Sequence, residues 1–219
     1  MSAAVGQILG DAIGVAISPV PVIALILILF SAAAGRNSLA FLAGWLLGLA
    51  GVGILVLALG LGSTSDGDSG DIVRVAIGAI FILLGFRQWR QRPRPGEPAK
   101  MPAWMESVDR LNAASAFGLG LLLTVPNPKN AGLTIAAAAS IGAAGLDSGQ
   151  ELTALAIFVT LASLTVALPI AFFFLARDRA RSALDSVKIW LIDNSHTVMT
   201  VLFVVLGAKV LGDGISGLG

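Results

Sequence analysis

The sequence of 219 residues contains no cysteine and no tyrosine, and it has a single histidine. Without cysteine there can be no disulfide bond, no thiolate metal site and no cysteine nucleophile. The HExxH and GxSxG motifs of metalloproteases and hydrolases are also absent. Because the usual acid, base and nucleophile pairs are missing, we expect no enzyme. We also expect no cofactor, no metal and no nucleic-acid partner.

Charge is scarce as well. Only 12% of the residues are charged and 56% are hydrophobic, with a mean hydropathy of +0.90, whereas soluble domains are about a quarter charged. This composition predicts a multi-pass protein of the inner (plasma) membrane. The opening MSAAVGQILGD lacks the basic residues of a signal peptide, so we expect the first apolar run to be retained as a span.

Six apolar runs predict an all-α fold with six transmembrane helices. A helix needs about 18 or more apolar residues to cross some 30 Å of hydrocarbon. The third run is shorter, but Arg74, Arg87 and Trp89 can anchor it at the two interfaces; a buried re-entrant segment is the alternative. The runs are Val5–Ala34, Leu39–Leu61, Ile72–Phe86, Ala113–Ala144, Leu152–Ala176 and Val198–Leu218.

The basic residues predict the orientation. Ten of the fourteen lysines and arginines lie in residues 87–112 and 177–188, so both connections are expected in the cytoplasm. The connections near Asp66 and Asp147 are acidic and contain no basic residue. With six spans, both termini are then extracytoplasmic.

Two segments outside the spans have their own character. Residues 90–112 form a basic, proline-rich stretch that we interpret as a cytoplasmic linker, acting either as a topology determinant or as a docking site. Residues 181–191 predict a helix on the inner membrane surface, because one face carries Ala183, Leu184, Val187, Trp190 and Leu191.

A weak repeat divides the chain into halves, 1–89 and 113–219, of three helices each. FILLGFR (81–87) and FVVLGAK (203–209) share the pattern F-x-x-L-G-x-(R/K), and prolines interrupt the first and fourth runs near their centres. As straight helices these two runs would be about 45 and 48 Å long, so we expect each to be broken at its prolines. Three spans per half make the repeat inverted, which is typical of secondary transporters.

The two breaks predict the binding site. Ser18-Pro19 and Asn127-Pro128 each resemble a capped helix start, and inverted symmetry would bring these positive helix ends together. Lys129 adds a charge, so the site should prefer an anionic lipid headgroup or a small anionic solute. Alternatively, Lys129 pairs with a structural acid or carbonyl. The predicted substrate-binding residues are Ser18, Pro19, Pro21, Asn127, Pro128, Lys129 and Asn130.

Two charged residues are weaker candidates for ion coupling. Asp11 lies in the first run and could pair with Lys129 or carry a proton, while Lys209 closes the second half. Small-residue faces would also permit close helix packing, and a homo-oligomer is left open. These faces are Gly44/Gly48/Gly51 and Ala136/Ala139/Ala143.

Taken together, the broken first run, Asn127-Pro128-Lys129 and the closing F-x-x-L-G-x-(R/K) resemble the GAP family of the LysE exporter superfamily, the family of Sap-like sulfolipid-addressing proteins. The resemblance covers essentially the whole chain. It implies outward movement of an envelope lipid or related component. The first break reads Pro19-Val20-Pro21 where amino-acid exporters commonly have Pro-Gly-Pro, which disfavours amino-acid export. The alternatives are an amino-acid or ion exporter and a non-transporting partner of an envelope-lipid biosynthesis complex.

Overall fold

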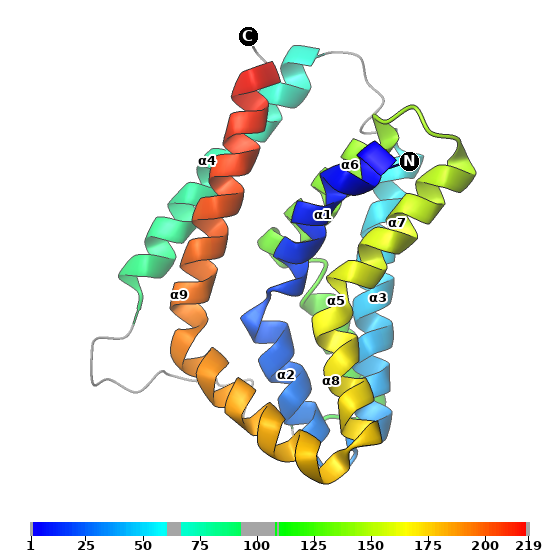
Figure 1. Cartoon of the computed structure of the whole chain (residues 1–219), viewed down its shortest axis with the longest axis vertical. Coiled ribbons are helices and arrows are strands. Elements are labelled where there is room, and N and C mark those ends of the chain that lie inside the picture. Colours follow the sequence, from blue (N-terminus) through cyan, green and yellow to red (C-terminus); the bar gives the residue numbers. More distant parts are fainter. Residues whose placement is uncertain (1, 61–66, 93–107, 109, 218–219) are drawn as a thin grey trace. The chain divides into compact units, whose positions relative to one another are not determined.

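The computed structural model describes residues 2–60, 67–92, 108 and 110–217. Regular structure in these residues is helical (Figure 1). Most of the predicted 90–112 linker and the residues around Asp66 lie outside the described part. The helices are α1 (Ser2–Ala16), α2 (Pro19–Phe30), α3 (Ala34–Ala58), α4 (Gly67–Arg90), α5 (Ala113–Leu122), α6 (Pro128–Gly142), α7 (Ser148–Ala162), α8 (Leu164–Leu175) and α9 (Arg177–Gly217).

Several of these helices are long and apolar enough to cross a membrane. Two qualify alone, α3 and the 179–216 part of α9. Two others are bent pairs, α1 with α2 at 54° and α7 with α8 at 58°. These features indicate a multi-pass membrane protein and confirm the predicted all-helical fold. The count of six spans and the orientation stay predictions.

The breaks in the first and fourth apolar runs lie where the prolines predict them. Helix α2 begins at Pro19 and α6 begins at Pro128. The fifth run is broken too, at Ser163, a position that its sequence does not mark. Pro169 lies six residues further on, inside α8. The surface helix predicted over 181–191 is continuous with the last span, as part of α9.

The chain forms two compact units, which we describe separately. One comprises residues 1–62 with 100–192, and the other residues 63–99 with 193–219. Each unit therefore draws on both of the predicted halves, and α9 contributes to both units. The division into two sequential three-helix repeats stays a prediction.

In the first unit, α3 packs against α2, α5, α6, α7 and α8. Its glycines permit a very close approach to α5: a Cβ at Gly44 would overlap the Phe117 backbone, and one at Gly48 would overlap the Thr124 side chain. Part of the predicted small-residue face is thus used within the chain, whereas Gly51 faces open space. A homo-oligomer stays a prediction.

In the second unit, α4 packs side by side with the last part of α9 (Figure 1). The contacts are reciprocal. A Cβ on Gly85 would lie 3.0 Å from the Val204 side chain, and one on Gly207 would lie 2.8 Å from the Ile82 side chain. Gly85 and Gly207, like Ile82 and Val204, are 122 positions apart, so the F-x-x-L-G-x-(R/K) segments pack on each other with local two-fold symmetry. Phe81 and Phe203 stack edge to face across this contact, 5.6 Å between ring centroids.

Candidate functional site

The first break is shaped by two prolines that leave helix carbonyls without their usual donors. In an uninterrupted helix, the Val15 carbonyl would accept from residue 19 and the Ile17 carbonyl from residue 21. Pro19 and Pro21 have no N–H to donate. The end of α1 therefore presents unsatisfied carbonyls, which are the negative end of a helix dipole.

Lys129 satisfies this helix end from the first turn of α6. Its Nζ donates to the Gly14 carbonyl at 2.5 Å, to Ser18 Oγ at 2.6 Å and to the Ile17 carbonyl at 3.3 Å. Only 1% of Lys129 is exposed. We call this arrangement of Lys129 with Gly14, Ile17 and Ser18 the lysine clamp. An ammonium has three donors, and the clamp uses all three.

Two hydroxyl groups bond the remaining carbonyls at the end of α1. Ser18 Oγ lies 2.8 Å from the Val15 carbonyl and 3.0 Å from Asn130 Oδ1, so its single hydrogen can be donated to either. Thr165, at the start of α8, donates its hydroxyl to the Ala16 carbonyl at 2.6 Å. The last carbonyls of α1 are therefore bonded by side chains from α6 and α8 and by Ser18.

The second break is capped locally. Asn127 Oδ1 accepts from the backbone N–H groups of Lys129 and Asn130, and Pro128 occupies the first helical position. Asn130 then bridges the two breaks, because its Nδ2 donates to the Leu123 carbonyl at 2.8 Å while its Oδ1 faces Ser18. Asn127 therefore caps α6 as predicted.

Ser18 does not cap α2 as the sequence suggested. It occupies the N-cap position of α2 but makes no side-chain cap hydrogen bond. The reason is that its hydroxyl is engaged with Lys129 and with the Val15 carbonyl. The Ser18 side chain thus forms its hydrogen bonds at the end of α1 rather than at the start of α2.

The predicted site residues are largely brought together in the first unit. Ser18, Lys129 and Asn130 are in direct contact, while the prolines and Asn127 shape the breaks around them. Lys129 points to the end of α1, which matches the interpretation in which it pairs with a carbonyl; anion binding stays a prediction. The structure adds Thr165, which sequence reasoning missed and for which a hydroxyl in an apolar run was the only signal.

The two coupling candidates lie in different units. Asp11 is in α1, with 3% of its surface exposed. Lys209 is in the second unit and pairs with Asp213 at 3.5 Å. A role for either in coupling stays a prediction. Among the described residues, no three His, Asp or Glu side chains are grouped closely enough to hold a metal ion.

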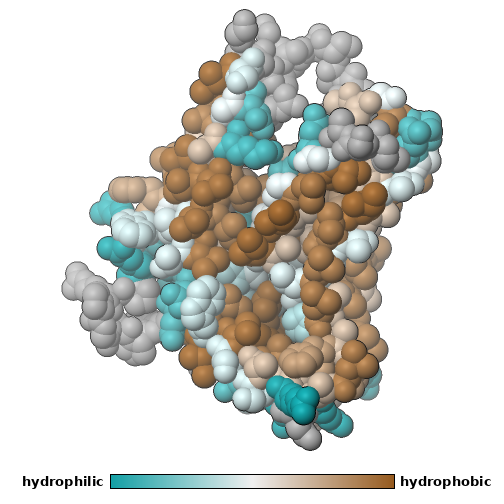
Figure 2. Space-filling view, in the orientation of Figure 1, coloured by the Kyte–Doolittle hydropathy of each residue, from teal (hydrophilic) through white to brown (hydrophobic). Residues whose placement is uncertain are grey.

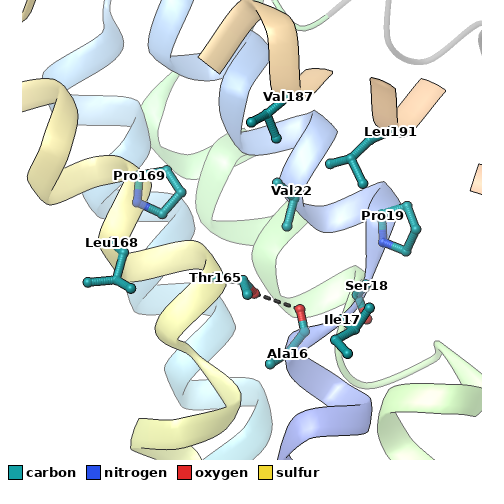
Figure 3. A pocket seen from close by; sticks show the side chains of 10 residues that line it. All are labelled: Ala16, Ile17, Ser18, Pro19, Val22, Thr165, Leu168, Pro169, Val187 and Leu191. Atoms are coloured by element: carbon teal, nitrogen blue, oxygen red, sulfur yellow. Dashed lines mark hydrogen bonds between the residues drawn. The ribbon is translucent and has the colours of Figure 1, made fainter. Parts of the chain in front are cut away.

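An apolar pocket of about 350 Å³ lies on the α8 side of the first break (Figure 3). Helices α1 and α2 form one wall, α8 forms the opposite wall, and two residues of α9 close the end. Thr165 lies in the α8 wall, and its hydroxyl donates to the Ala16 carbonyl. The lining residues are Ala16, Ile17, Ser18, Pro19, Val22, Thr165, Leu168, Pro169, Val187 and Leu191.

Comparison with known proteins identifies a family. The sequence model of the family described as "Sap, sulfolipid-1-addressing protein" matches residues 8–216, which confirms the resemblance to Sap-like proteins. No curated protein and no solved structure matches the chain.

Proposed function

Because the chain belongs to the Sap, sulfolipid-1-addressing protein family, we propose that it is a membrane exporter for an anionic envelope lipid or a small anionic solute. The protein moves this substrate outward itself or assists its movement. The observation that carries the proposal is the lysine clamp, in which a buried charge joins the broken ends of two apolar segments.

The lysine clamp makes insertion into the membrane less favourable, and a protein that serves only as a membrane scaffold would gain nothing from it. A lysine at the centre of a transmembrane helix costs about 2.5–3.5 kcal/mol on insertion scales. Two interrupted helices add backbone groups that need partners inside the membrane. Broken helices that meet at a central site are typical of secondary transporters, where helix ends bind the substrate.

The clamp also offers a route to anion binding. The Ile17 carbonyl is the most distant of the three acceptors, at 3.3 Å, so it is the contact that an anionic group replaces at the lowest cost. The N-terminus of α6 adds a positive helix end beside the ammonium. A sulfate, phosphate or carboxylate that takes this donor would loosen α1 from Lys129. Substrate binding and the angle between α1 and α2 would thereby be coupled.

Replacing the lysine tests the proposal. Lys129→Met keeps the apolar stem but removes the charge, so loss of a charge-assisted contact should reduce export about tenfold to a hundredfold. Lys129→Arg should restore export only in part, since a planar guanidinium does not replace a compact ammonium. The measurement is the amount of anionic envelope lipid in the outer leaflet of cells that lack the native protein and express each variant at a matched membrane level.

Lys188→Met serves as the matched control. Lys188 pairs with Asp185 at 2.6 Å on α9 and takes no part in the clamp, so this variant should export normally. Undiminished export by a folded Lys129→Met protein would contradict the proposal. That result would favour the alternative of a non-transporting partner of an envelope-lipid biosynthesis complex.

A further inference from the structure

The pocket beside the first break is chemically suited to hydrocarbon. Its two hydroxyl groups are already bonded, Thr165 to the Ala16 carbonyl and Ser18 within the lysine clamp. A polar ligand would lose its hydration without gaining partners there. The volume of about 350 Å³ exceeds the roughly 150 Å³ of an engineered apolar cavity that admits benzene, so a segment of an alkyl chain fits.

The pocket opens onto an exposed apolar surface, the kind that a membrane protein turns toward lipid. Three of its lining residues are well exposed, Ile17 at 44%, Leu168 at 60% and Val187 at 45%. Figure 2 shows hydrophobic residues over the faces of α7 and α8 in view, with hydrophilic residues gathered where α8 meets α9. A lipid chain can therefore enter from the side without crossing a polar barrier.

The helix that closes the pocket also carries exposed positive charge. Arg177, Arg179 and Arg181 are exposed at the start of α9, while Val187 and Leu191 on the same helix line the pocket. Arg181 and Val187 are six residues apart, about 9 Å along a helix. This distance is within the half-thickness of the hydrocarbon layer, about 15 Å, so one lipid can reach both.

We propose that the pocket holds one alkyl chain of the anionic lipid that the protein exports, while the three arginines of α9 bind the headgroup of the same lipid. This inference rests on the proposed function and names its substrate as a lipid rather than a small solute. Ile17 and Ser18 belong both to the pocket wall and to the lysine clamp. An alkyl chain in the pocket therefore contacts two residues that are bonded to Lys129. Binding of the lipid is thereby coupled to the geometry of the first break.

Photolabelling of the full-length protein tests the site directly. The protein is reconstituted in phosphatidylcholine nanodiscs with a trace of phosphatidylglycerol that carries a diazirine midway along one chain, and labelled peptides are identified by mass spectrometry. We expect labels within residues 165–169 and 187–191. Phosphatidylcholine with the same diazirine should label them roughly fivefold less, because basic residues near the membrane surface favour anionic lipids.

Matched variants separate the chain site from the headgroup site. Leu168→Trp should fill the pocket mouth and abolish the label, whereas Leu175→Trp, on the same helix, 86% exposed and outside the lining, should leave it unchanged. Val187→Trp repeats the test from α9 if Leu168→Trp does not fold. Replacing Arg177, Arg179 and Arg181 by glutamine should keep the label but remove the preference for phosphatidylglycerol.

The outcomes distinguish this inference from the proposed function. Labels spread evenly over the lipid-facing helices, or equal labelling by both lipids, would overturn the inference even if Lys129→Met abolishes export. Labels confined to the pocket with a clear anionic preference support it. If Lys129→Met then exports normally, the proposed function fails while the lipid site stands.

Discussion

The α1/α2 break and the α7/α8 bend turn the chain by nearly the same angle, 54° and 58°, but their backbone groups are satisfied differently. At the bend, the Ser163 N–H donates to carbonyls of α7 and the Ser163 carbonyl accepts from N–H groups of α8. At the break, the carbonyls of α1 depend on Lys129 and Thr165, more than 100 residues away in the sequence. The backbone bonds at the bend lie within α7 and α8, whereas those at the break come from side chains of other helices.

This difference indicates which of the two sites can respond to a ligand. The backbone groups of Ser163 are bonded within α7 and α8, so they leave no backbone contact to exchange with a substrate. A joint held by an ammonium and a hydroxyl can exchange those contacts for contacts to an anion. Variants at the break and at the bend test this difference, and they are described in order of decreasing effect.

Restoring the missing donors at the break should have the largest effect. In Pro19→Leu/Pro21→Leu, the new N–H groups can bond the Val15 and Ile17 carbonyls and straighten the helix. In a continuous helix the Gly14 carbonyl also bonds the Ser18 N–H, so Lys129 loses or shares both of its carbonyl acceptors and keeps only Ser18 Oγ. Because removing one partner of a buried charge typically costs 3–5 kcal/mol, we expect a loss of about 3–5 kcal/mol in the free energy of unfolding, measured by denaturant titration in detergent micelles.

A double-mutant cycle provides the control. Adding Lys129→Met to the double proline variant should recover most of the lost stability, since the uncompensated charge is removed. Pro169→Leu in α8 should show no such dependence on Lys129. Additive effects of the proline and lysine substitutions would mean that the prolines do not create the acceptor site for the lysine.

Removing the cap of α6 should have an intermediate effect. Asn127→Ala deletes the acceptor for the backbone N–H groups of Lys129 and Asn130, so we expect a cost of about 0.5–2 kcal/mol together with reduced export. Asn112→Ala removes the corresponding cap of α5, an exposed bond to the Ser115 N–H. It should cost a similar amount of stability and leave export intact; equal export by both variants would argue against a functional second break.

The smallest effect is expected from a pair of isosteric threonine substitutions. Thr165→Val removes the bond to the Ala16 carbonyl across the joint and should lower stability by about 0.5–1.5 kcal/mol. Thr160→Val, just before the bend, removes only a bond within its own helix, to the Ala156 carbonyl, and should be nearly neutral. Thermal unfolding at matched detergent concentration compares them, and a larger loss from Thr160→Val would reverse our ranking of the two sites.

The prolines made part of the site predictable from sequence. Proline at the first helical position fixes where α2 and α6 begin, and Asn127 is a strong N-cap residue. The partners of Lys129 were harder to predict from the sequence, because the Gly14 and Ile17 carbonyls belong to the backbone and carry no side-chain signal. Sequence could indicate that the lysine needs a partner, but only the fold places the end of α1 against it.

The bend at Ser163 shows a second limit of sequence reasoning. The run Leu152–Ala176 contains no charged residue, and its proline lies six residues after the bend. The Trp45 indole donates to Ser163 Oγ at 3.2 Å, a contact across 118 positions that no local pattern reports. The paired F-x-x-L-G-x-(R/K) segments were visible as a repeat, yet their packing on each other follows from the tertiary fold.

That pairing of α4 with the end of α9 has a consequence for synthesis of the protein. Gly85 and Gly207 are 122 positions apart, so at about 5–20 residues per second α4 is complete for some 6 to 24 s before its partner leaves the ribosome. During this interval its glycine face has no cognate helix. Until α9 is synthesised, α4 has to persist without its partner helix. A chain truncated before α9 would leave α4 permanently unpaired and exposed to degradation by cellular quality control.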